Sequence, residues 1–76
     1  MVLSNHYIDG IGQFKQTTLP ANLFEKELKY AGYVLKEVQP SSYHNRHVYV
    51  YNHPEYRILY AIYSSNYSTV ITAYHP

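Results

Sequence analysis

Cysteine is absent from this 76-residue chain, which excludes both a disulfide framework and a thiolate metal site. Long apolar runs are also absent: none approaches the roughly 20 residues of a membrane span, and no signal peptide is visible. Charge is sparse, with six basic and five acidic side chains and a formal net charge of +1, unlike proteins that hold long duplex nucleic acid. We therefore expect a cytoplasmic protein with no membrane contact, whose contacts with any nucleic acid are local.

The sequence also lacks the usual signatures of catalysis and metal binding. It contains no nucleophile elbow and no glycine-rich phosphate loop, and its few acidic residues are scattered rather than paired. Histidines alone could form a zinc site only through His44, His47 and His53, at a loop–strand junction without a nearby carboxylate. We therefore expect no metal and no other cofactor.

Tyrosine and histidine are abundant instead. Eight of the eleven tyrosines and four of the five histidines lie between residues 43 and 76. A chain this short has little stability to spare, and aromatic rings supply much of the core that it can form. Because each buried tyrosine hydroxyl needs a hydrogen-bond partner, many of these rings should lie at the rim of the core rather than inside it.

One helix and four strands are predicted along the chain, after an amino-terminal arm at residues 1–19. Residues 20–31 form the helix, because Pro20 suits a first helical turn and Gly32 suits a left-handed C-terminal cap. Its apolar stripe comprises Leu23, Phe24, Leu28 and Ala31. Alternation of residue types predicts strands over 33–38, 46–52, 56–63 and 69–74. The predicted fold is α+β: a single domain over residues 1–76, with one helix packed on an antiparallel sheet of about four strands.

Turns at residues 52–55 and 64–66 predict the register of the last three strands. Tyr51 should lie opposite Tyr56, and Tyr63 opposite Ser68. The face beneath the helix would then carry His47, Tyr49, Ile58, Tyr60, Ile62, Ile71 and Ala73. The other face would carry Val48, Val50, Leu59, Ala61, Arg57, Thr72 and Tyr74, the last three close together on neighbouring strands.

These residue types suit metal-free cleavage of RNA. The reaction needs a base for the 2′-hydroxyl, an acid for the leaving oxygen and a cation beside the phosphorane. Histidine suits the first two roles and arginine the third, so the candidates are His47 or His44 as acid and base, and Arg46 and Arg57 as phosphate ligands. Tyrosines such as Tyr49 would stack on unpaired bases. Alternatively, the histidines are solvated residues at strand ends and the tyrosines form an interface surface.

The sequences FEKELKYAGYVL at 24–35, SSYH at 41–44 and HVYVYNHP at 47–54 resemble HicA-type mRNA interferases, over roughly residues 23–63. That family has a glycine at the entry to the second strand, where this chain has serines. It also has a closing helix, where this chain has a fourth strand. The resemblance implies that His44 or His47 is the catalytic histidine.

The sequences RILYAI at 57–62 and STVITAYHP at 68–76 resemble the last two strands of the barnase/EndoU/colicin/RelE-like ribonuclease group. In that group a basic residue on one strand and a Thr-x-Tyr-like pair on the final strand face the RNA. The resemblance implies that Arg57, Thr72 and Tyr74 face the substrate, with Tyr74 stacking on a base or donating a proton.

Both resemblances imply a small metal-independent ribonuclease of toxin type, which cleaves single-stranded RNA or tRNA and is neutralised by a partner protein. The alternative hypothesis is a non-enzymatic protein of a phage or mobile element that inhibits a host defence complex by protein–protein binding through a tyrosine-rich face. Homodimerisation through the open edge of the last strand is a further expectation. An enzyme needs His, Arg and Tyr side chains that converge in one site, whereas a binding protein needs an exposed aromatic surface.

Overall fold

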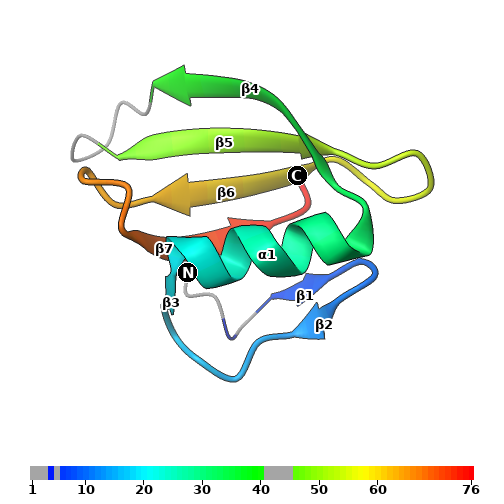
Figure 1. The fold of residues 1–76 in the computed structure, drawn as a ribbon, viewed down its shortest axis with the longest axis horizontal. Helices are drawn as coiled ribbons and strands as arrows, with labels where there is room; N and C mark the ends of the chain where they lie inside the picture. The colour runs from blue at the N-terminus through cyan, green and yellow to red at the C-terminus, as the bar shows by residue number, and fades with distance from the viewer. Residues whose placement is uncertain (1–3, 5, 41–45) are drawn as a thin grey trace.

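The computed structural model describes residues 4, 6–40 and 46–76, which form one helix and seven strands (Figure 1). The predicted site residue His44 lies outside the described residues. The strands before the helix are short: β1 (Tyr7–Ile8), β2 (Gly12–Gln13) and β3 (Leu19–Pro20). Helix α1 (Ala21–Ala31) precedes four longer strands: β4 (Val34–Pro40), β5 (His47–Asn52), β6 (Leu59–Tyr63) and β7 (Thr69–Tyr74).

Five strands form one antiparallel sheet in the order β3-β7-β6-β5-β4, and β1 and β2 form a separate hairpin. Helix α1 lies across one face of the sheet, in front of β7 in Figure 1. The α+β class, the single helix and the antiparallel sheet confirm the prediction. The fifth strand was not predicted: Leu19 and Pro20 pair with Val70 and Thr69, because the chain enters the helix alongside β7.

The C-terminal end of α1 follows from one glycine. Gly32 has a φ of 95°, a left-handed conformation that favours glycine. In this conformation the N–H of Gly32 donates to the carbonyl of Lys29 at 3.1 Å, and the N–H of Tyr33 donates to that of Leu28 at 3.0 Å. The chain therefore leaves the helix abruptly and enters β4.

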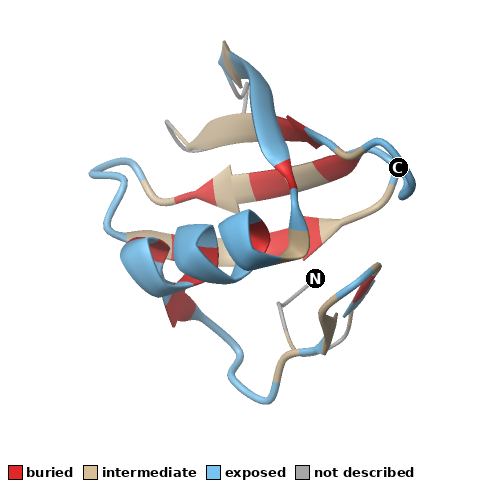
Figure 2. Cartoon of the chain, turned by 45° about the vertical axis from the view of Figure 1, so that its right-hand side comes forward, coloured by how far each residue is buried: buried red, intermediate tan, exposed pale blue. Residues whose placement is uncertain are grey.

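The inner face of α1 packs on the sheet through Ala21, Phe24 and Leu28, which are buried. The Phe24 ring meets Tyr63 of β6 edge-on at 6.4 Å between centroids, and it packs against Phe14 of the arm at 5.6 Å. Leu23, predicted to belong to the apolar stripe, is 49% exposed and lines a hollow together with Phe14 and Leu19. Figure 2 shows the buried positions along the inner face of α1 and on β5 to β7, while β4 is largely exposed.

The predicted register is wrong at both hairpins. Tyr51 pairs with Leu59 instead of Tyr56, and Tyr63 pairs with Val70 instead of Ser68. The face beneath the helix therefore carries Tyr49, Tyr51, Leu59, Ala61, Tyr63 and Ala73, together with His47. The opposite face carries Val48, Val50, Tyr60, Ile62, Thr72 and Tyr74.

Long turns explain the shift in register. The turn between β6 and β7 is organised by Asn66, whose Oδ1 accepts hydrogen bonds from Ser64 Oγ at 2.8 Å, Ser68 Oγ at 2.7 Å and Ser68 N at 3.1 Å. The turn between β5 and β6 extends as far as Ile58, whose carbonyl is held by His75 at 2.9 Å. Residues predicted as strand are therefore turn residues, Arg57 among them.

Three tyrosines lie inside the core, although most tyrosines were expected at its rim. Tyr33, Tyr51 and Tyr63 are at most 6% exposed. The hydroxyls of Tyr51 and Tyr63 form a 2.6 Å hydrogen bond with each other, and the hydroxyl of Tyr33 donates to the carbonyl of Asp9 at 2.7 Å. Burial raises the pKa of Tyr51 to about 12 and also raises the pKa of Tyr63. Mutual hydrogen bonding thus lets hydroxyl groups enter the core.

The outer edge of the sheet is β4, not the last strand. Strand β7 lies between β6 and β3, whereas no strand in the described part of the chain pairs with the far side of β4. The edge expected to support homodimerisation is therefore occupied over Thr69 and Val70.

Candidate functional site

Asp9 organises the end of the sheet where the β1–β2 hairpin meets the β5–β6 turn. Its carboxylate binds Arg57 through two hydrogen bonds, Nε to Oδ2 at 2.9 Å and Nη2 to Oδ1 at 3.0 Å. These hydrogen bonds lower the pKa of Asp9 from 3.8 to about 2, because they stabilise the carboxylate form. The pair ties the amino-terminal arm to a turn 48 residues away.

His75 completes this contact from the C-terminal side. Its Nε2 accepts a hydrogen bond from the backbone N–H of Asp9 at 3.0 Å, and its Nδ1 donates to the carbonyl of Ile58 at 2.9 Å. Because an N–H can only donate and a carbonyl can only accept, these contacts place the ring proton on Nδ1. The side chain is 3% exposed. His75 therefore connects the arm, the turn and the last strand.

His53 makes the equivalent connection to the helix. Its Nε2 donates to the carbonyl of Ala31 at 2.6 Å, and its Nδ1 accepts from the N–H of Glu55 at 3.0 Å. The ring is stacked on Tyr56 at 4.2 Å between centroids and meets Tyr33 at 5.0 Å. These contacts satisfy one carbonyl at the end of α1 and fix the turn after β5.

We call Asp9, Tyr33, His53, Arg57 and His75 the arm-end network. Burial is the main reason that the pKa of Tyr33 rises to about 12, and the nearby Asp9 carboxylate adds to it. Every side chain of the network holds a backbone group or another member by a hydrogen bond. The network therefore has a structural role: it holds together the amino-terminal arm, the end of α1, the β5–β6 turn and the residue that follows β7.

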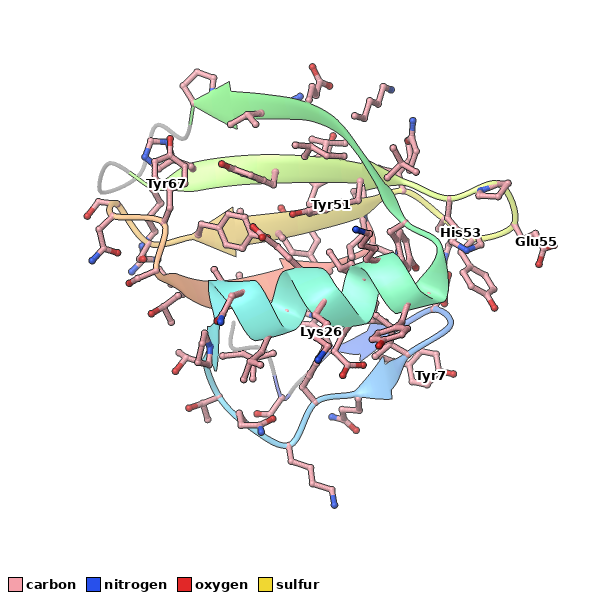
Figure 3. All side chains as sticks on the ribbon, viewed as in Figure 1. Tyr7, Lys26, Tyr51, His53, Glu55 and Tyr67 are labelled. Atoms are coloured by element: carbon pink, nitrogen blue, oxygen red, sulfur yellow. The ribbon has the colours of Figure 1, made fainter. Side chains whose placement is uncertain are left out.

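Three exposed tyrosines lie on the segments that the arm-end network joins: Tyr7 is 64% exposed, Tyr30 80% and Tyr56 38%. Tyr7 lies in β1, two residues before Asp9, and Tyr30 precedes the helix residue that His53 holds. In Figure 3, Tyr7 and His53 lie at the same end of the molecule. We call these three residues the tyrosine surface. Beside it, Lys26, Lys29 and Tyr30 line a hollow of about 420 Å³.

The opposite end of the sheet has a different character. The rings of His47 and Tyr67 are stacked at 4.0 Å between centroids with an angle of 13° between planes, and Tyr49 lies 5.9 Å from Tyr67. Tyr67 has a φ of 62°, which is unusual for a residue other than glycine. We call Arg46, His47, Tyr49 and Tyr67 the His47 end. Figure 3 shows Tyr67 and His53 at opposite ends of the sheet.

The predicted site residues fall into three places. Arg46, His47 and Tyr49 belong to the His47 end. Arg57 belongs to the arm-end network, separated from His47 by more than the roughly 13 Å that four strand residues span.

Thr72 and Tyr74 lie on the face opposite the helix. Thr72 is buried, with no hydrogen-bond partner for Oγ1 among the described residues, and the Tyr74 ring lies 6.0 Å from His6 and 5.9 Å from Tyr60. The structure thus keeps Thr72 with Tyr74 on one face and His47 with Arg46 and Tyr49 at one end, whereas the recorded partner of the Arg57 side chain is Asp9.

Sequence reasoning missed the roles of Asp9, Tyr33, His53 and His75. Asp9 and His75 are 66 residues apart, so no local pattern connects them. The one local signal was Asp9-Gly10, a turn sequence in which Gly10 takes a φ of 82° with its Cα against the Tyr56 ring.

No family model, curated protein or solved structure matches this chain. In the described ranges, no three His, Asp or Glu residues are grouped as a metal site would require. Helix α1 is too short to cross a membrane, and no other helix occurs among these residues.

Proposed function

We propose that this protein acts without catalysis, by binding another protein through the tyrosine surface of Tyr7, Tyr30 and Tyr56. The observation that carries the proposal is the arm-end network, which engages His53, Arg57 and His75 in structural hydrogen bonds and joins the segments that carry these rings. Arg57, which was a candidate phosphate ligand, is thereby used to hold the scaffold, and large aromatic side chains are left exposed on the segments that the network joins.

Rigid support of exposed tyrosines favours binding. A tyrosine provides a large contact area with few rotatable bonds, and a surface that is already ordered loses little entropy when a partner binds. Tyr56 is held by its stack on His53, which is itself fixed by two hydrogen bonds. Such aromatic residues are typical of the energetically dominant positions in protein interfaces.

The hollow beside Tyr30 indicates the chemistry of the partner. Two lysines, Lys26 and Lys29, line it together with the exposed Tyr30. This combination suits a carboxylate next to an apolar or aromatic group. We therefore propose a partner whose contact surface is acidic at its rim and apolar at its centre.

Photo-cross-linking in source cells tests this proposal. A photoreactive phenylalanine analogue replaces Tyr30 in one variant and Tyr67 in a control, since both positions are exposed. We expect position 30 to cross-link one protein, and Lys26→Glu to abolish that product. Equal products from both positions, or products unaffected by Lys26→Glu, would contradict a specific site around Tyr30.

A ribonuclease is the second candidate function, and the His47 end supports it. There the imidazole of His47 is stacked on Tyr67, and Arg46 precedes His47 in the chain. Histidine, arginine and an aromatic ring are the residue types that cleavage of single-stranded RNA needs. In this proposal His47 exchanges protons with the RNA and Arg46 binds the phosphate. Arg57 has no catalytic role in it, because its guanidinium is paired with Asp9.

Induced expression in a bacterial host, with total RNA followed over time, separates the two candidates. For a ribonuclease, growth stops and RNA is fragmented, and His47→Ala abolishes both effects while Tyr30→Ala leaves them unchanged. For a binding protein, RNA stays intact in all variants. Circular dichroism of each purified variant confirms that loss of activity is not loss of folding.

A further inference from the structure

Strand β4 is an unusual edge strand, because it is long and exposes three large apolar side chains. It spans seven residues, and Val34, Leu35 and Val38 are 65%, 47% and 47% exposed. Its outward backbone groups have no strand partner in the described part of the chain. An edge of this kind is a template for pairing with another strand. We propose that β4 pairs antiparallel with β4 of a second copy of this chain, joining two five-stranded sheets into one.

The charge pattern of β4 favours a second copy of this chain as the partner that pairs with this edge. Lys36 and Glu37 are adjacent, so a two-fold axis between them places Lys36 of each copy opposite Glu37 of the other. Opposite charges directly across a strand pair stabilise it. A lysine on an edge strand ordinarily opposes pairing, but here the same sequence supplies its counter-ion.

A bulge in β4 makes this register consistent with the two faces of the sheet. Leu35 pairs with Tyr51 and Val38 with Tyr49, so both lie on the helix side although they are three residues apart. The irregularity between Leu35 and Glu37 accounts for this spacing. With the axis between Lys36 and Glu37, Leu35 of one copy lies opposite Val38 of the other, on the same face.

The pair of Val34 with Gln39 in this register also has both side chains on the same face of the sheet. Val34 pairs with Asn52 and Gln39 with Val48, so both lie on the face away from the helix and meet across the axis. Moving the axis by half a residue, onto Lys36 or onto Glu37, would place like charges opposite each other and set Leu35 against the wrong face. The sequence and the bulge therefore favour one register.

This inference is independent of the proposed function, because β4 contributes no residue to the tyrosine surface or to the His47 end. The test is the mass of the full chain in solution, measured by sedimentation equilibrium over a concentration series. We expect the wild type to approach twice 8.9 kDa. Lys36→Glu and Glu37→Lys each create two like-charge pairs, so each should weaken the dimer roughly tenfold or more. The double exchange, K36E with E37K, should restore it.

Two results of the sedimentation experiment would overturn the proposal. One is a wild type that sediments at 8.9 kDa at every concentration up to about 1 mM, the affinity range of the weakest specific complexes. The other is a dimer that K36E and E37K leave unchanged, since such a dimer would use another surface.

The chain has no cysteine, so V34C with Q39C supplies a second measurement: oxidation should give a covalent dimer that a reducing agent dissociates. Failure to cross-link at concentrations where the wild type is dimeric would also contradict this register.

Discussion

At the arm end, His53 and His75 each hold one backbone acceptor and one backbone donor, whereas at the other end His47 lies flat against the ring of Tyr67. The same residue type thus has a structural role at one end of the sheet and an exposed aromatic partner at the other. The difference arises because the arm, the helix end and a long turn meet at only one end, and their backbone groups need hydrogen-bond partners there. Abundant histidine is therefore not by itself evidence for catalysis.

The largest difference between the two ends is expected in the stability that is lost when one histidine at each end is replaced. His75→Ala should lower the free energy of unfolding by about 2–4 kcal/mol, because it leaves the N–H of Asp9 and the carbonyl of Ile58 without partners. His47→Ala should lower it by about 1 kcal/mol or less, the value of one aromatic stack. Urea unfolding followed by circular dichroism measures both. Equal losses in the two variants would contradict the structural assignment of His75.

Alanine substitutions at two glycines test whether His53 is fixed in place. Gly32 and Gly12 have φ values of 95° and 111°, so alanine is strained at both. An added Cβ at position 32 would lie 2.9 Å from His53 Nε2, whereas at position 12 it would meet nothing within 4 Å. Gly32→Ala should therefore destabilise the fold by about 2 kcal/mol and Gly12→Ala by about 1 kcal/mol, judged from thermal unfolding. If the two variants unfold alike, His53 is not fixed as described.

Acid should loosen the arm end first. The pKa of Asp9 falls from 3.8 to about 2 on folding, so its contribution to stability is present above about pH 4 and is lost as the pH falls toward 2. The difference in melting temperature between the wild type and Asp9→Asn should thus be positive at neutral pH and vanish near pH 2. A difference that does not change with pH would show that the Asp9–Arg57 ion pair adds nothing.

The smallest effect on stability is expected at the His47 end. Tyr67→Gly relieves a positive φ of 62° but removes the stack on His47, and these two changes of about 1 kcal/mol each should nearly cancel. The melting temperature should therefore move by no more than a few degrees. Any activity on RNA that depends on this end should nevertheless be lost. A large fall in stability would mean that Tyr67 holds the fold rather than a ligand.

The sequence was sufficient to predict the helix and the four longer strands, though not β1 to β3, because the signals of these longer elements are local. Phe24 and Leu28 recur at helical spacing, and Gly32 marks the helix end, so bounds of 20–31 differ by one residue from Ala21–Ala31. The prediction that Leu23 belongs to the packed apolar stripe was wrong, because helical spacing alone cannot show where the sheet beneath the helix ends.

The register and the site could not be predicted in the same way. Each depends on contacts between distant segments, such as Asp9 with Arg57 and His75, that fix how long a turn is. A change of an odd number of residues in the register reverses which face a side chain occupies, so Tyr60 and Ile62 were assigned to the wrong face. The predicted grouping of Arg57 with Thr72 and Tyr74 depended on that register.

The most direct test of the account is the tautomeric state of the histidines, measured by long-range proton–nitrogen correlation spectroscopy on the isotope-labelled protein. The hydrogen bonds predict one fixed tautomer for each ring at the arm end, with the proton on Nε2 in His53 and on Nδ1 in His75. Observation of these two tautomers would establish both histidines as structural residues. An averaged mixture of tautomers in both rings would contradict the arm-end network and the structural role assigned to these two histidines.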